Sequence, residues 1–192
     1  MESRDIILTE YVGRAGTLLI CEQEREALRK RFSPAFLEYI FEGEPDRHPE
    51  LSAEDKALAI REEVKDRKDV FCFGFSEGGF FSALWSFAEA MKCGMDIYLD
   101  SVPMKQETIE VCEVFEINPY YLLCGDENVL IACSCGSELV RSLRSRGVRA
   151  EIVGSTNGTK NRIIHQRDTD RFVTRPMKDE WVHYLERKGK IS

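Results

Sequence analysis

The stretch Gly74-Phe75-Ser76-Glu77-Gly78-Gly79 separates two apolar runs of different length. Residues 70–73 before it are typical of a buried strand, and residues 80–91 after it are typical of a helix. A helix that begins at such a turn has first-turn N–H groups without intrahelical partners, and its dipole favours an anion there. We therefore take as candidate ligand-binding residues Gly74, Ser76, Glu77, Gly78 and Gly79.

The same turn has a purely structural interpretation. Glycine permits close packing of a helix against a sheet, and Ser76 can simply cap the helix that follows. Glu77 complements the positive end of the helix dipole, but it also repels an anionic ligand. Because a single Gly-Gly pair is a weak signal, the turn alone leaves both interpretations open.

Length and charge restrict the class of protein. The chain has 192 residues, which we interpret as one domain (1–192), with an N-terminal strand and helices in 1–50 and the core in 51–192. Its 34 acidic and 27 basic residues give a net charge of −7, which argues against nucleic acid or an anionic membrane as the main partner. The longest apolar stretch, residues 78–91, is too short to span a bilayer.

The cysteines indicate a cytoplasmic protein with reduced thiols. They number seven, and no charged-then-apolar leader opens the sequence. Cys133-Ser134-Cys135 lacks a second pair at zinc-like spacing, and we interpret its thiols as partly buried packing groups. The three histidines lie in unrelated segments, so we expect no metal ligands. No firm catalytic set surrounds the glycine turn, and we expect no catalytic residues.

Strands and helices alternate along the chain, which predicts a layered α/β or α+β domain. The predicted strands are 5–9, 70–73, 95–99, 129–133, 150–154, and a hairpin of 161–165 with 171–174. The predicted helices are 17–31, one opening at Ser33-Pro34, one opening at Ser52, 77–92, 105–115, 136–146 and a last one after Pro176. Residues 43–49 are expected to form a loop.

Two features need partners that the sequence does not identify. The helix after the glycine turn is apolar nearly all round, so we expect the sheet on one side and either the N-terminal helices or a second subunit on the other. Asp96 and Asp100 share one face of the predicted strand, where they could hold a metal or, more simply, form a solvated edge.

With these segments in view, residues 5–186 resemble the C-terminal half of the aminoimidazole-ribonucleotide-synthetase (PurM) superfamily, closest to the HypE-type hydrogenase maturation factors. Residues 7–17 are similar to the segment that joins the two halves in that group. The turn Ser76-Glu77-Gly78-Gly79, followed by Ala83-Leu84-Trp85, is similar to its glycine-rich signature. Residues 97–103 and 107–132 follow its order and spacing.

The resemblance implies an α+β fold, a layered α/β/α sandwich with a mixed sheet. The ATP-binding N-terminal half of the family, which carries most metal-binding acids and usually builds the dimer, is expected to be absent. Gly74 stands where the family signature has an acidic residue, and Ser192 stands where HypE-type proteins end in a reactive cysteine. The chain alone is therefore not expected to catalyse a reaction, and ATP and Mg²⁺ are expected only with a partner in trans.

The leading hypothesis is a stand-alone accessory module that forms a homodimer and binds a small phosphate-like ligand or a partner protein at the glycine turn. The first alternative is the C-terminal component of a split ATP-dependent, maturation-type enzyme that a separate ATP-binding protein completes. The second alternative is a structural or regulatory homo-oligomer with an empty turn.

Overall fold

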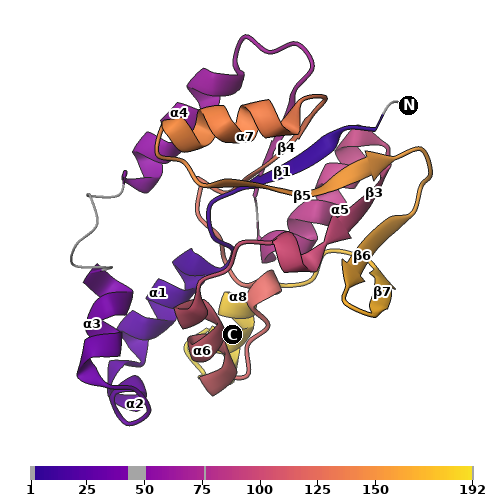
Figure 1. Ribbon diagram of the computed structural model, residues 1–192. Coiled ribbons are helices and arrows are strands. Elements are labelled where there is room, and N and C mark those ends of the chain that lie inside the picture. Colours follow the sequence, from indigo (N-terminus) through magenta and orange to yellow (C-terminus); the bar gives the residue numbers. More distant parts are fainter. Residues whose placement is uncertain (1–2, 43–50, 76, 192) are drawn as a thin grey trace.

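A mixed seven-stranded sheet forms the centre of the molecule (Figure 1). The structure is a computed structural model that describes residues 3–42, 51–75 and 77–191. The strand order is β2-β4-β1-β5-β3-β6-β7, and every neighbouring pair is antiparallel except β3 with β6. The strands are β1 (Asp5–Thr9), β2 (Phe71–Gly74), β3 (Gly94–Tyr98), β4 (Val129–Cys133), β5 (Ala150–Asn157), β6 (Arg162–Gln166) and β7 (Thr169–Phe172).

Helices cover both faces of this sheet (Figure 1). The α-helices are α1 (Arg14–Gln23), α2 (Arg25–Arg29), α3 (Pro34–Glu42), α4 (Ala53–Val64), α5 (Gly79–Met91), α6 (Gln106–Val114), α7 (Gly136–Ser145) and α8 (Glu180–Arg187), and two short 3-10 turns are η1 (Leu99–Ser101) and η2 (Pro119–Tyr121). Helices α4 and α7 lie on one face and α5 on the other, which confirms the predicted layered α+β sandwich with a mixed sheet.

Strand β1 lies in the middle of the sheet, between β4 and β5. Ile6 and Leu8 point towards α5, whereas Ile7 points towards α7, and all three side chains are fully buried. A strand that is apolar on both faces requires cover on both faces, because successive side chains alternate between them. The continuous apolar run at residues 6–8 therefore matches its position.

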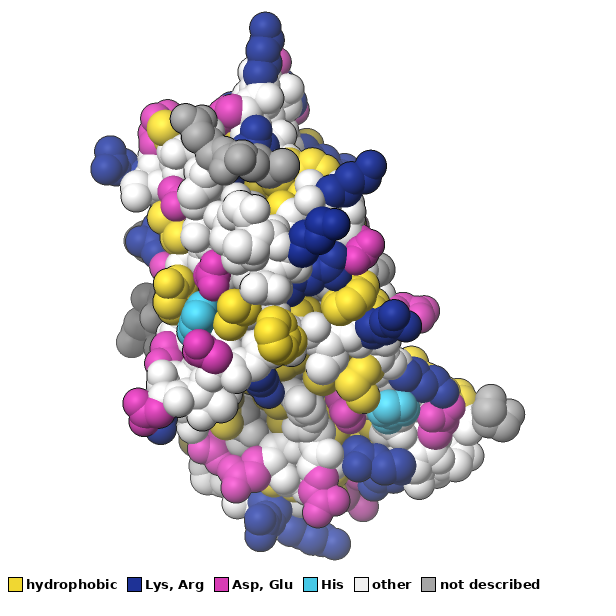
Figure 2. Space-filling model, turned by 90° about the vertical axis from the view of Figure 1, so that its right-hand side faces the viewer, with side chains coloured by type: hydrophobic (Ala, Val, Ile, Leu, Met, Phe, Trp, Pro, Cys, Tyr) yellow, Lys and Arg dark blue, Asp and Glu magenta, His cyan; other side chains and the backbone are white. Residues whose placement is uncertain are grey.

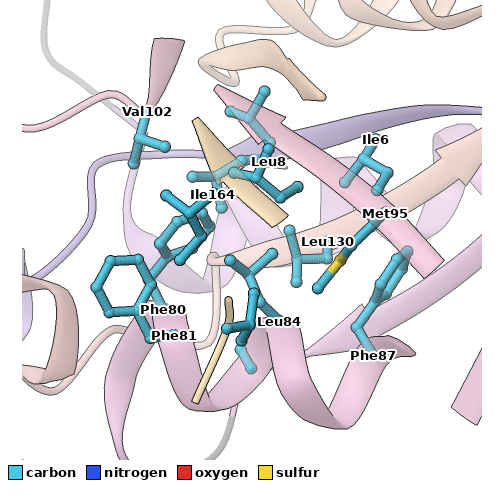
Figure 3. Packing of buried hydrophobic residues seen from close by; sticks show 14 of the residues in the cluster. Ile6, Leu8, Phe80, Phe81, Leu84, Phe87, Met95, Val102, Leu130 and Ile164 are labelled. Carbon is cyan, nitrogen blue, oxygen red and sulfur yellow. The ribbon is translucent and has the colours of Figure 1, made fainter. Parts of the chain in front are cut away.

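Helix α5 fills the second layer. Figure 3 shows Phe80, Leu84 and Phe87 pointing from α5 towards the strands that carry Leu8 and Met95. The other side of α5 is covered by η2, where the rings of Phe81 and Tyr120 stack at 4.8 Å.

The N-terminal helices do not provide the second cover of α5, contrary to expectation. The described parts of α1, α2 and α3 instead form a separate cluster with α6 and α8, below the sheet in Figure 1. Its buried members are Ile20, Cys21, Leu28, Ile40, Val111, Cys112, Ile117, Leu122 and Tyr184.

One further prediction differs from the structure. The helix predicted at 17–31 is divided into α1 and α2 at Glu24, whose φ of −113° is not helical. The Glu24 carboxylate accepts a hydrogen bond from the Tyr184 hydroxyl of α8. The loop expected at 43–49 lies outside the described residues.

The cysteines form no disulfide, and all seven are free thiols. Cys133 is buried, as predicted for a packing group, but Cys135 is exposed. No helix in the described ranges is both long and apolar enough to cross a bilayer.

The β6–β7 hairpin protrudes on the right in Figure 1, and Figure 2 views the molecule from that side. Hydrophobic side chains run across the middle of this face, with acidic and basic side chains between them. Exposed large hydrophobic residues of the molecule include Tyr98, Phe172 and Met177. The visible basic side chains of described residues are interspersed with acidic ones, so this face is not a continuous basic surface.

Asp96 and Asp100 do not share a strand, and Asp96 does not form a solvated edge. Strand β3 ends at Tyr98, so Asp100 falls in η1. Asp96 Oδ1 lies 2.9 Å from His165 Nε2, and Asp170 Oδ1 lies 2.7 Å from His165 Nδ1. The hydrogen bonds with Asp96 and then Asp170 raise the pKa of His165, and this one imidazole ring links β3, β6 and β7.

We predict that His165→Gln reduces the dependence of stability on pH near neutrality. The raised pKa in the folded state means that the contribution of His165 is complete below the unfolded pKa of about 6.5 and is lost as pH rises through the folded value. We expect a change of up to about 1 kcal/mol, because the pairs are partly exposed. Urea unfolding at pH 5.5 and 8.5 measures it.

The matched control is His183→Gln in α8. The same pH dependence in wild type and His165→Gln would contradict the prediction, provided that His183→Gln also follows the wild type.

Candidate functional site

The glycine turn connects β2 to α5, and its backbone conformation requires glycine. Gly78 has φ of 90° and Gly79 has φ of 64°, which side chains rarely tolerate. A Cβ at Gly78 would lie 2.3 Å from Ser82 Oγ and 2.6 Å from the Met177 carbonyl oxygen. A Cβ at Gly79 would lie 2.7 Å from the Leu122 carbonyl oxygen. The turn is therefore enclosed by backbone on two sides.

The other predicted site residues that the structure describes, Gly74 and Glu77, are exposed, unlike Gly78 and Gly79. Gly74 is exposed at the end of β2, with nothing within 4 Å of the position of a Cβ. Glu77 is exposed directly before the buried pair Gly78 and Gly79. Ser76 lies outside the described residues. The structure thus brings together an exposed acid and two buried glycines.

Asp179 occupies the position at which the sequence predicted an external anion. Its side chain is buried, and Oδ2 accepts a hydrogen bond of 3.0 Å from the Gly78 N–H. Oδ1 accepts a hydrogen bond of 2.8 Å from the Trp181 N–H, which makes Asp179 the N-cap of α8. One carboxylate therefore satisfies donors of the glycine turn and of a helix end.

Burial and hydrogen bonds have opposite effects on the pKa of the Asp179 carboxyl group. Burial raises the pKa of Asp179, and N–H groups of Trp181, Gly78 and Leu123 partly oppose that shift. The negative charge of Glu77 raises the pKa further. A second anion arriving at the turn would meet two acidic side chains, Asp179 and Glu77.

Sequence reasoning missed Asp179. An acidic residue directly before Glu180-Trp181 is a recognisable N-cap signal. That local signal does not reveal the contact with Gly78, because the two residues are 101 positions apart.

The segment beside the turn, residues 124–128, is held by hydrogen bonds to residues 9–13. The Asn128 amide donates to the Thr9 carbonyl at 2.9 Å, and the Thr9 hydroxyl donates to the Glu127 carbonyl at 2.6 Å. Gly13 N–H points to Cys124 Sγ at 3.3 Å. Burial raises the pKa of Cys124 to about 12, so this thiol is neutral and unsuited to nucleophilic attack. In the described ranges no group of three His, Cys, Asp or Glu side chains is placed to hold a metal ion.

A cavity of about 750 Å³ adjoins the same segment, between α1, α4 and residues 125–127. Its wall includes a buried ion pair in which Lys56 Nζ lies 2.9 Å from Glu10 Oε2. The charged residues of its wall are Glu10, Arg14, Glu54, Lys56, Arg61, Asp126 and Glu127. With four acidic and three basic side chains, this wall is not a basic surface.

Comparisons with known proteins show the fold. No protein-family model and no curated protein matches the chain. The structure of the hydrogenase maturation protein HypE from E. coli has a TM-score of 0.67 at 16% identity, over 93% of this chain and 51% of that one. PurL from T. maritima has a TM-score of 0.54 at 14% identity, over 95% of this chain and 27% of that one.

A third similar structure is thiamine-monophosphate kinase from Stenotrophomonas maltophilia, with a TM-score of 0.54 at 16% identity, over 84% of this chain and 49% of that one. The chain spans about half the length of E. coli HypE. At these identities the similarity concerns the fold and not the site.

We predict that Asp179→Ala lowers the free energy of unfolding by about 2 kcal/mol, because it removes an N-cap and leaves the buried Gly78 N–H without an acceptor. Asp179→Asn should cost less, since its amide oxygen still accepts hydrogen bonds. Urea unfolding measures both, with the exposed Asp168→Ala as the matched control. Equal stability of Asp179→Ala and Asp168→Ala would show that this carboxylate does not hold the turn.

Proposed function

We propose that this chain, which has the PurM-like fold of HypE, PurL and thiamine-monophosphate kinase, is an accessory module without catalytic activity of its own. It binds a small phosphate-like anion at the glycine turn and forms a homodimer in the cytoplasm. The observation that supports the binding site is the hydrogen bond from Gly78 N–H to the Asp179 carboxylate, since the turn already receives a negative oxygen. The seven free thiols support a reducing compartment.

The ligand competes with Asp179 for the turn. The two carboxylate oxygens have separate donors, so rotation of the side chain releases Gly78 while α8 can keep part of its cap. Burial and Glu77 raise the pKa of Asp179, and a protonated carboxyl group no longer repels the incoming anion. Binding is therefore expected to strengthen as pH falls towards that pKa, as long as the ligand keeps its charge.

We predict that millimolar inorganic phosphate shifts the amide resonances of Glu77, Gly78 and Gly79, and that sodium chloride of equal ionic strength does not. Asp179→Asn should bind phosphate about tenfold more tightly, because one negative charge leaves the site. Gly78→Ala should abolish the shift, since its Cβ would clash with Ser82 and Met177. NMR titration measures all three.

The matched control for Gly78→Ala is Gly158→Ala, where nothing lies within 4 Å of the Cβ position. Circular dichroism establishes that each variant folds. Unchanged resonances at the turn in both wild type and Asp179→Asn would refute phosphate binding there.

A second candidate function is supported by the structural similarity to HypE. The chain covers about half of that protein, one HypE structure with this fold is a complex with ATP, and another is a HypE–HypF complex. In this alternative the chain is one component of a split, ATP-dependent maturation-type enzyme, and a separate ATP-binding protein supplies the Mg²⁺-binding acids in trans.

Co-purification from the source cell separates the two functions. A stable complex with an Asp-rich partner, and ATP hydrolysis that needs both chains, would support the split enzyme. ATP hydrolysis by the isolated chain would contradict both proposals. A third possibility, a structural or regulatory homo-oligomer with an empty turn, predicts an oligomer in sedimentation that does not respond to phosphate.

A further inference from the structure

The two edge strands of the sheet differ in charge. Strand β7 at one edge carries Asp170 and Arg171. Strand β2 at the other edge reads Phe71-Cys72-Phe73-Gly74 and continues into Phe75, with no charged residue and no proline. Charges and prolines are the usual protection of an exposed edge against further strands. Strand β2 lacks that protection and has no outer neighbour in the described sheet.

Two residues of β2 have backbone N–H and C=O groups that point away from the sheet. Phe75 N–H donates to the Asn128 carbonyl at 3.4 Å, on the side of β4. Because the N–H and C=O of one residue in an antiparallel strand point to the same side and alternate along the strand, Phe71 and Phe73 also face β4. The N–H and C=O groups of Cys72 and Gly74 therefore point away from the sheet.

The side chains of this edge divide between the two faces. The half-buried rings of Phe71 and Phe73 lie 5.7 and 6.4 Å from the ring of Phe87, and the ring of Phe75 lies 6.2 Å from that of Phe80. All three rings thus lie against α5, and they form an aromatic rim along the edge. On the other face Cys72 is exposed and the space above Gly74 is open.

The pattern Phe-x-Phe-x-Phe is the same in both directions. An antiparallel strand centred on Phe73 would place Phe71 opposite a second Phe75, and Cys72 opposite a second Gly74. This register aligns aromatic pairs on one face and brings together the outward-facing groups of Cys72 and Gly74. We propose that β2 is a homodimerisation edge that pairs with β2 of a second copy about a two-fold axis at Phe73.

Charge disfavours two symmetric registers at the opposite edge. In a symmetric antiparallel pair, opposite side chains lie on the same face, so a two-fold axis on β7 at Arg171 or at Asp170 puts two like charges opposite each other. The same symmetry on β2 opposes only uncharged residues. The contact is short, so the dimer should be weak and concentration-dependent.

This inference rests on the homodimer of the proposed function but not on phosphate binding. Gly74→Pro removes an N–H that has no acceptor within the sheet, and proline is tolerated at an edge. We expect the wild type to dimerise in sedimentation velocity, and Gly74→Pro to raise the dimer dissociation constant at least about tenfold, through the loss of two symmetric hydrogen bonds. Gly74→Ala, which keeps the N–H and fits the open space, should behave as wild type.

The opposite edge supplies a second control. Val173 N–H donates to Arg162 across the hairpin, so Phe172 N–H points outwards, and Phe172→Pro is the equivalent change on β7. It should leave the dimer intact. A wild type that stays monomeric at millimolar concentration, a Gly74→Pro variant that dimerises as wild type, or dissociation by Phe172→Pro would each overturn the inference.

Cross-linking tests the register even if Gly74→Pro fails to fold. With diamide as the oxidant, Gly74→Cys should form a disulfide with the partner's Cys72, because opposite residues of such a pair have Cα atoms about 5.5 Å apart. Non-reducing electrophoresis should show a covalent dimer, and adding Cys72→Ser should remove it. A Gly74→Cys chain that stays monomeric, or a cross-link that persists without Cys72, would refute the register.

Discussion

The backbone at Gly78 and Gly79 passes between Ser82, Met177 and Leu122 with no space for a Cβ, and the rest of the structure depends on this close approach. It determines where α5 begins, and α5 supplies the rings that pack on the centre of the sheet. Van der Waals contact of this kind is sensitive to a single added carbon, because protein interiors are close-packed. The turn is therefore an element of the core before it is a site for any ligand.

Asp179 links that core to the C-terminal helix. A buried carboxylate is costly unless hydrogen bonds compensate for lost hydration, and here backbone donors from three segments do so. The same donors are those that an anionic ligand would use. Stability and ligand affinity are thus opposed at this residue: each interaction that strengthens the internal cap also strengthens the competitor that a ligand must displace.

Local sequence patterns predicted the helices and strands better than they predicted the contacts between distant segments. The cap of α4 by Ser52 and the extent of β4 follow from signals within a few residues. The Glu24 side chain at the break accepts a hydrogen bond from Tyr184, and Gly78 N–H donates to Asp179, so both sites involve contacts across the chain that local patterns do not contain. The nearly continuous apolar surface of α5 indicated that it needed a second cover, but the N-terminal helices were the wrong choice for it, because apolar character does not specify the receiving surface. The overall fold was predicted through resemblance to the PurM superfamily.

The edge strand and the glycine turn are consecutive, and this continuity has a thermodynamic consequence. Residues 71–75 would carry the dimer contact, and Gly78 follows a few residues after Phe75. If pairing of β2 changes the position of the turn, dimerisation changes anion affinity, and linkage then requires the anion to change dimerisation by the same factor. Asp179 would belong to the same coupled unit, because its carboxylate accepts the hydrogen bond from Gly78 N–H. In this way the proposed module would report the presence of an anion through its state of assembly.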